Sequence, residues 1–226
     1  MNNSKGTYIF ILVVLMTLFT QFCIAQKNVI IPDLGKIVEG LDWKIVNREA
    51  EIIRENDQRC IYFEAAPGDG IAWLKNFEFT NGIIEVDTKG KDVRGISYVG
   101  IAFRGVNENI YDAVYFSPFN FKSDDPVRTS NSVQYISHPD YPWQRLRTEY
   151  SGKYENQVNP VPDPNYFFHA KIIIEKPKIS VYVDDGKEPC LVVEELSDRN
   201  SGWIGLWVGN KSDGTFANLR IIPQKN

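Results

Sequence analysis

The chain has 226 residues, of which 13% are aromatic, and a formal net charge of −4. Without residues 1–25, which hold one lysine and no acidic residue, 24 basic and 29 acidic residues remain, a net charge of −5. This acidic balance argues against a nucleic-acid partner. The remaining length is sufficient for one substantial hydrophobic core.

The N-terminus has the features of a signal peptide over residues 1–25. Lys5 precedes an apolar run from Tyr8 to Phe22, and the small residue Ala25 stands before Gln26. We therefore expect an exported protein, secreted or periplasmic. An uncleaved membrane anchor fits less well, because the run is short for a bilayer span and is interrupted by Thr17.

A cysteine in this segment raises a second possibility. Lipid attached to Cys23 would make the chain a cell-surface lipoprotein. The preceding Phe22 is bulkier than the residue expected before a lipidated cysteine. Ordinary cleavage after Ala25 is therefore favoured over a lipid anchor, and no membrane insertion is expected after cleavage.

After a lead over residues 26–40, residues 41–226 read as one β-sandwich domain. Short runs of alternating polarity are separated by Gly, Asn, Asp and Pro, and no long helical pattern is present. So many short strands predict an all-β, antiparallel sandwich of two sheets. The predicted strands are Trp43–Asn47, Glu51–Arg54, Cys60–Ala65, Gly70–Phe79, Gly82–Lys89, Ile96–Arg104, Tyr111–Phe116, Ser132–Ser137, Tyr166–Glu175, Ile179–Asp184, Cys190–Glu194, Gly202–Val208 and Phe216–Ile222.

Turn residues mark two hairpins, and one long segment departs from the strand pattern. The hairpins turn at Gly105–Asn109 and at Asp184–Gly186. The segment Ser117–Pro164 is irregular, with one short predicted strand inside it. Long insertions of this kind are usually functional or mobile.

The run Ser201–Gly209 sorts two chemistries onto two faces. Ile204, Leu206 and Val208 are predicted to face the core, while Trp203 and Trp207 alternate with glycines on the other face. Tryptophan beside glycine suits a surface that stacks against sugar rings. The alternative is that a loop or the N-terminal segment covers these tryptophans.

Two carboxylates share one face of the predicted strand Gly82–Lys89. Glu85 and Asp87 alternate with Ile84 and Val86, which places them about 7 Å apart. Paired carboxyl groups at this separation can cleave a glycosidic bond. A solvated sheet face needs polar residues at the same positions, and the pattern alone favours this simpler interpretation.

The predicted strand Ile96–Arg104 carries small residues on one face, rimmed by Tyr98 and Arg104. With Tyr115 of the next strand, this face could hold a planar polar ligand, and Arg104 would donate hydrogen bonds to it. Alternatively, Arg104 pairs with Glu85 or Asp87 within the sheet. The two roles are compatible.

The irregular segment gathers ring and guanidinium groups between Ser137 and Arg147. His138, Trp143 and Arg147 are candidate ligand contacts, with His138 also a candidate acid or base. The second histidine, His169, falls in an apolar strand and is predicted to be structural.

Several chemistries lack support in the sequence. It contains no Cys and His spacing typical of a metal site, no phosphate-binding glycine loop and no nucleophile elbow. No cofactor is expected, although loops such as Asn107–Asn109 leave a structural calcium ion open. Cys60 and Cys190 could form one disulfide, but two buried free thiols are the favoured interpretation.

Three segments resemble the concanavalin A-like lectin and glucanase superfamily, particularly its 3-keto-disaccharide hydrolase-like and laminin G-like jelly rolls. They are Phe77–Asp87 with its F-x-N-G-x-I-E-x-D style of pattern, the hairpin Ile179–Gly186 and the closing strand Gly214–Leu219. The resemblance implies a jelly roll whose concave face binds carbohydrate. Family 16 glycoside hydrolases carry E-[IL]-D-x-x-E, of which Glu85–Gly90 matches only the first half, so their mechanism does not carry over.

Three functions remain open. The first is glycan binding by Trp203, Trp207, Arg104 and Tyr115, with His138, Trp143 and Arg147 supplied by the loop. The second is a glycoside hydrolase that uses Glu85, Asp87 and His138 beside the same cleft. The third is a non-catalytic module whose aromatic face binds a protein.

Overall fold

The structure is a computed structural model, and it describes residues 28–224. The predicted signal peptide, residues 1–25, and Cys23 lie outside the described residues. Within residues 28–224, no helix has the length and apolar character needed to cross a membrane.

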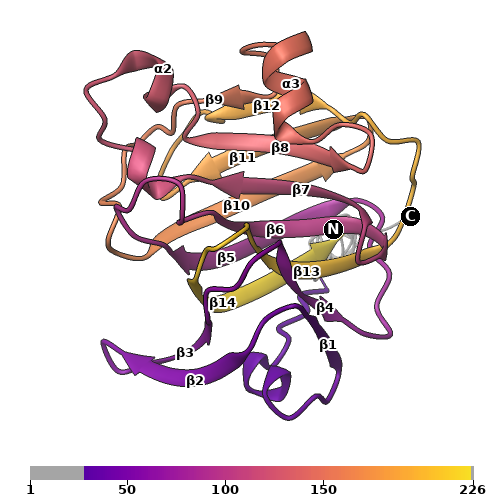
Figure 1. Ribbon diagram of the computed structural model, residues 1–226. Coiled ribbons are helices and arrows are strands. Elements are labelled where there is room, and N and C mark those ends of the chain that lie inside the picture. Colours follow the sequence, from indigo (N-terminus) through magenta and orange to yellow (C-terminus); the bar gives the residue numbers. More distant parts are fainter. Residues whose placement is uncertain (1–27, 225–226) are drawn as a thin grey trace, which may run out of the picture.

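Two antiparallel sheets of seven strands each pack face to face (Figure 1). Sheet I has the order β1-β4-β13-β6-β7-β8-β9, and sheet II has the order β12-β11-β10-β5-β14-β3-β2. The strands are β1 Trp43–Val46, β2 Ala50–Glu55, β3 Gln58–Phe63, β4 Gly70–Leu74, β5 Gly82–Lys89, β6 Val99–Asn107, β7 Ile110–Phe116, β8 Val133–His138, β9 Glu155–Asn156, β10 Phe168–Glu175, β11 Lys178–Val183, β12 Leu191–Glu194, β13 Trp203–Val208 and β14 Gly214–Pro223. The prediction of an all-β sandwich is confirmed.

Every predicted strand overlaps an observed one, and β5 has the predicted bounds. Both predicted hairpins are present, as β6 with β7 and β11 with β12. The irregular segment contains more structure than predicted, because β9 pairs with β8 and three short helices flank them. These helices are η2 Pro118–Asn120, α2 Pro126–Thr129 and α3 Trp143–Glu149, while η1 Leu34–Ile37 lies near the N-terminus.

The two sheets differ in how their outer faces are treated. In sheet II, β5 and β10 alternate between buried and partly exposed residues, as expected for a sheet with one solvated face. In sheet I, β4 is buried throughout, and β7 and β13 are buried except at their first residues. The outer face of sheet I is therefore covered by other parts of the chain.

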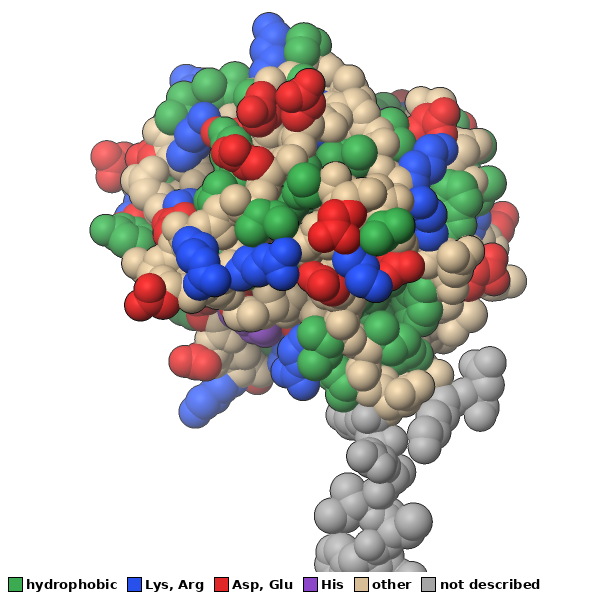
Figure 2. Space-filling model, turned by 90° about the horizontal axis from the view of Figure 1, so that it is seen from below, with side chains coloured by type: hydrophobic (Ala, Val, Ile, Leu, Met, Phe, Trp, Pro, Cys, Tyr) green, Lys and Arg blue, Asp and Glu red, His purple; other side chains and the backbone are tan. Residues whose placement is uncertain are grey.

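Acidic and basic side chains are interspersed with apolar ones over the face of the molecule seen from below (Figure 2). Exposed ion pairs also occur among the described residues, as between Lys36 and Asp42 and between Lys44 and Glu108. A mixed surface of this kind keeps a small domain soluble without a field of one sign.

Arg104 does not lie where strict alternation along β6 predicted. Its backbone has a φ of 54°, in the left-handed region, and the pairing of β6 with both neighbours is irregular beyond Phe103. This bulge turns the side chain away from the outer face, and Arg104 is completely buried. The prediction that Arg104 shares a face with Tyr98 and Tyr115 is therefore wrong.

The buried Arg104 side chain ties together three segments. Its Nη2 lies 3.0 Å from the Glu195 carboxylate, whose side chain is also fully buried, and Nη1 donates to the carbonyl groups of Thr80 and Asn200. The partner is thus Glu195, and neither Glu85 nor Asp87, which the alternative interpretation had offered. Nearby, buried Asp112 accepts hydrogen bonds from Ser197 and Arg199, so charges anchor the segment after β12.

Cys60 and Cys190 are both buried and free, which confirms the interpretation as thiols over the disulfide alternative. Burial raises the pKa of the Cys190 thiol to about 11. The thiol is therefore protonated at neutral pH.

Because Arg104 and Glu195 are both withdrawn from water, we expect Arg104→Met to lower the free energy of unfolding by about 3–5 kcal/mol, since the buried carboxylate loses its closer cation and keeps only Lys176, at 4.0 Å. Urea unfolding measures this loss. Arg220→Met is the matched control, because the Arg220 side chain is half-exposed and pairs with Glu85 on the sheet surface, where a loss of less than about 1 kcal/mol is expected. Equal losses in the two variants would contradict the account.

Candidate functional site

A hollow of about 740 Å³ opens over the outer face of sheet I. Its size lies within the range of small-molecule binding sites. The surrounding segments are distant in sequence, namely the turn before β4, the segment before β6, the loop from β8 into α3, and the turn after β13. The lining residues are Asp69, Gly95, Tyr98, Tyr115, Ile136, His138, Pro142, Trp143, Gln144, Arg145, Trp207, Gly209 and Asn210.

Aromatic rings form the floor of the hollow. Trp207 lies on Tyr115 with ring centroids 5.2 Å apart, and Tyr98 meets Tyr115 edge to face at 5.8 Å. Trp207 and Tyr115 are each only 3% exposed, whereas Tyr98 is partly exposed. Trp207 therefore belongs to a packed floor and is not a free stacking platform, and the ring that packs on it comes from β7 and not from a loop or the N-terminal segment.

The glycines beside the tryptophans accommodate rings of the protein itself. A Cβ atom at Gly205 would lie 2.9 Å from Trp73, and one at Gly209 would lie 3.1 Å from Trp207. Such separations leave no room for a side chain. The predicted trough in which a ligand approaches the glycine backbone is therefore wrong at these two positions. Ile71 and Trp73 fill the space at Gly205, and Tyr98 and Trp207 fill it at Gly209.

A chain of hydrogen bonds connects the floor to an acidic residue. The indole Nε1 of Trp207 donates to the Tyr111 hydroxyl at 3.2 Å, and that hydroxyl donates to Oδ2 of Asp69 at 3.1 Å. Burial raises the pKa of Asp69, although the Tyr111 hydrogen bond and the charge of His138 act in the opposite direction. Asp69 is partly exposed and lines the hollow, so a ligand can reach its carboxylate.

His138 lies at the wall beside this chain. Its ring contacts the Tyr111 ring at a centroid distance of 5.0 Å, and the imidazole is partly buried. Burial lowers the pKa of His138, while the negative charges of Asp69 and Asp112 partly offset that effect. The imidazole is therefore neutral at pH 7 and can donate or accept a hydrogen bond.

The helix α3 forms the rim and presents an exposed tryptophan. Trp143, the first residue of α3, is 43% exposed, whereas Leu146 is fully buried and fixes the helix on the protein. The Arg147 guanidinium lies 4.9 Å from the Trp143 ring centroid and donates two hydrogen bonds to Oε1 of Gln134, at 3.1 and 2.7 Å. Arg147 thus connects the exposed ring to β8, whose Gln134 is fully buried.

The structure brings four of the predicted site residues into the hollow: Tyr115, His138, Trp143 and Trp207. Of the others, Arg147 stands next to the hollow against Trp143. Trp203 does not line the hollow and packs on Trp73, with ring centroids 5.9 Å apart. Arg104 is buried in its ion pair and takes no part in the hollow.

Glu85 and Asp87 do not lie beside the hollow. They belong to β5 in sheet II, where Glu85 pairs with Arg220 at 3.1 Å. Asp87 accepts hydrogen bonds from Asn218 at 2.6 Å and pairs with His169 at 2.8 Å. The expectation that these carboxylates share a cleft with His138 is wrong, since the two groups belong to the outer faces of different sheets.

The sequence reasoning missed Asp69 as a site residue. Asp69 stands in an ordinary turn sequence, Pro67–Gly70, which gave no chemical signal. One feature could have indicated that Asp69 belongs to the site. It stands directly before β4, a wholly apolar strand that is adjacent to β13 in the sheet. That adjacency depends on strand order, which the sequence alone did not provide.

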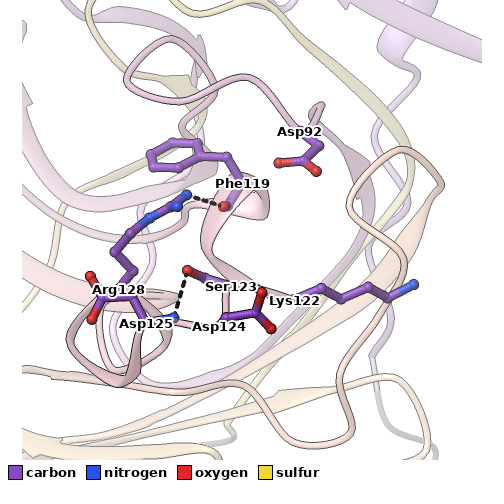
Figure 3. Close-up of a pocket in the computed structure, with 7 residues that line it drawn as sticks. All are labelled: Asp92, Phe119, Lys122, Ser123, Asp124, Asp125 and Arg128. Carbon is purple, nitrogen blue, oxygen red and sulfur yellow. Dashed lines mark hydrogen bonds between the residues drawn. The ribbon is translucent and has the colours of Figure 1, made fainter.

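A second hollow, of about 360 Å³, lies between the segment after β5 and the turn leading into α2 (Figure 3). Its Arg128 donates to the Phe119 carbonyl group, and Asp125 accepts from the Val127 backbone as the cap of α2. The Arg128 guanidinium and the Asp125 carboxylate therefore stabilise the local structure around α2.

Calcium was left open for the loop Asn107–Asn109. Oδ1 of Asn107 accepts hydrogen bonds from the backbone of Asn109 and Ile110, which closes the turn. Over residues 28–224, no group of three or more His, Cys, Asp or Glu side chains is arranged to hold a metal ion.

No family model matches the chain, and no curated protein matches it. Solved structures do. A carbohydrate-binding module, CBM66, from Bacillus subtilis aligns with a TM-score of 0.57 at 16% identity, covering 80% of this chain and 95% of that one.

Two further structures extend the comparison. A native glycosidic hydrolase aligns with a TM-score of 0.55 at 13% identity, covering 88% of this chain and 97% of that one. The lumenal domain of VIP36, bound to Ca²⁺ and Man3GlcNAc, aligns with a TM-score of 0.53 at 10% identity, covering 83% and 86%. At these identities the likeness establishes the fold alone, which is a concanavalin A-like, jelly-roll β-sandwich.

Proposed function

We propose that the protein binds carbohydrate in the hollow over sheet I. The observation that carries the proposal is the combination of an aromatic floor, an exposed ring at the rim and polar groups at the wall. Sugars present apolar ring faces together with hydroxyl groups, so aromatic stacking and a few directed hydrogen bonds suit them. Asp69, His138 and Asn210 would supply the polar contacts, and Trp143 and Tyr98 would supply stacking.

The comparisons support this proposal through the fold. A carbohydrate-binding module and a lectin domain crystallised with mannose-containing ligands share the architecture. An exported location, secreted or periplasmic, is part of the proposal and rests on the predicted signal peptide, residues 1–25. Fold likeness alone does not assign a ligand, so the residues of the hollow carry the argument.

Carbohydrate processing is a weaker candidate. The hydrolase neighbour shares the fold, but Glu85 and Asp87 are engaged on sheet II, away from the aromatic hollow. Released sugar measured beside binding would distinguish the two functions, because a binding module leaves the glycan intact.

Trp143→Ala and Tyr98→Ala are expected to weaken binding of a glycan identified on an array by about tenfold each, because each removes an accessible ring from the hollow. Isothermal titration calorimetry measures the change. Tyr166→Ala is the matched control, since Tyr166 is 66% exposed and does not line the hollow. Unchanged affinity in both hollow variants, or an equal loss in the control, would contradict the proposed site.

Arg147 is expected to act as a positioning residue for Trp143. Arg147→Met removes the hydrogen bonds to Gln134 and the cation beside the indole, so we expect about threefold to tenfold weaker binding. Lys153→Met is the control, because Lys153 is an exposed cation over the Tyr154 ring, 5.3 Å from its centroid, and does not line the hollow.

A double-mutant cycle separates positioning from direct contact. If Arg147 acts through Trp143, Arg147→Met has little further effect on affinity once Trp143 is alanine. Full additivity of the two losses would show that Arg147 contacts the glycan or acts independently.

A further inference from the structure

The charges around the hollow are distributed unevenly. Three of its lining residues can carry charge, namely Asp69, His138 and Arg145. His138 is neutral at pH 7, because burial lowers its pKa. Among the lining residues, Asp69 and Arg145 therefore carry the charge that a ligand meets, and these two residues are engaged very differently. Arg94 and Arg147 act on Tyr98 without lining the hollow, and Arg147 pairs with Glu155 at 3.5 Å.

The positive charge of Arg145, at the rim of the hollow, is largely neutralised by acceptors on the protein. Its Nε donates to the Glu149 carboxylate at 2.8 Å, and Nη1 donates to the Asp140 carbonyl group at 2.8 Å. The guanidinium also lies over the Tyr141 ring, 4.7 Å from its centroid. The side chain is 41% exposed, so water screens what remains of its field.

Asp69 has no such compensation from a direct ion pair among the described residues. Its carboxylate accepts from the neutral Tyr111 hydroxyl at 3.1 Å. Arg48 also acts on it, but this residue is 7% exposed and directs its guanidinium at the carbonyl groups of Asn47, Gly68 and Gly209. Asp69 lines the hollow, whereas Arg48 does not.

From this asymmetry we infer that the hollow selects neutral or amino sugars and rejects sugars that carry a carboxylate or sulfate group. The inference rests on the proposed function and specifies its substrate class. An ionised carboxylate accepts hydrogen bonds from sugar hydroxyls and attracts an ammonium group. It repels a uronate or sulfate in a partly buried site, where Coulomb interactions exceed those in water.

The test uses paired glycans that differ only in charge. Galacturonan hexasaccharide and its carboxyl-reduced, neutral form make one pair, and cellohexaose with chitosan hexasaccharide and sulfated cellohexaose form a matched series. We expect the full chain to bind the neutral or amino member at least about tenfold more tightly than the acidic member. Raising the salt concentration to 1 M should reduce that ratio.

Asp69→Asn keeps an acceptor for the Tyr111 hydroxyl and removes the charge, so we expect the ratio to fall below about threefold. Asp213→Asn is the control. Asp213 accepts from the Tyr62 hydroxyl at the same 3.1 Å distance, also pairs with Lys91 at 2.7 Å and lies outside the hollow, so its variant should keep the ratio.

The outcomes separate this inference from the proposed function. Equal or tighter binding of the acidic members, or a ratio that Asp69→Asn leaves unchanged, overturns the charge selection while glycan binding stands. Absence of binding to every member, or binding that Trp143→Ala does not weaken, overturns the proposed site and the inference with it. A neutral preference that Asp69→Asn removes and Asp213→Asn preserves supports both.

Discussion

The packing of large rings over small residues on the outer face of sheet I is the constraint on which the site depends. Trp73 and Trp207 occupy the space above glycines of this sheet, and Trp207 is bonded through Tyr111 to Asp69. The face is thereby converted from a sheet surface into a rigid aromatic floor. The hollow lies over this layer beside α3, and its Asp69 carboxylate is held by the Tyr111 hydroxyl of the same layer.

The outer faces of the two sheets differ in how far their side chains are buried. The outer face of sheet II carries polar side chains that form ion pairs and hydrogen bonds, as between Glu85 and Arg220. Every second residue of β5 is therefore partly exposed. The strands β4, β7 and β13 of sheet I are almost completely buried. The buried ion pair between Arg104 and Glu195 fixes the segment that leads into β13. A dry, rigid face limits the entropy lost when a ligand binds.

The local pattern of polar and apolar residues was sufficient to predict the fold class and the strands. It also showed that glycines stand beside Trp207. It placed Arg104 on the wrong face, because a single left-handed residue breaks an alternation that the sequence displays without interruption. It also paired Glu85 with His138, which requires knowing which strand belongs to which sheet. Asp69 was invisible for the same reason, since its neighbours on β7 and β13 are distant in sequence. Strand order is set by long-range packing that short patterns do not encode.

The central claim is that a glycan occupies the hollow over sheet I, and the indole N–H signals of the five tryptophans test it directly. In a ¹H–¹⁵N titration with a glycan that binds, the account predicts shifts for Trp143 and Trp207, which line the hollow. Trp43 should stay unchanged, because it is buried elsewhere and its Nε1 donates to the Asp33 carbonyl group at 3.2 Å. Saturable binding that leaves the Trp143 and Trp207 signals in place would contradict the account.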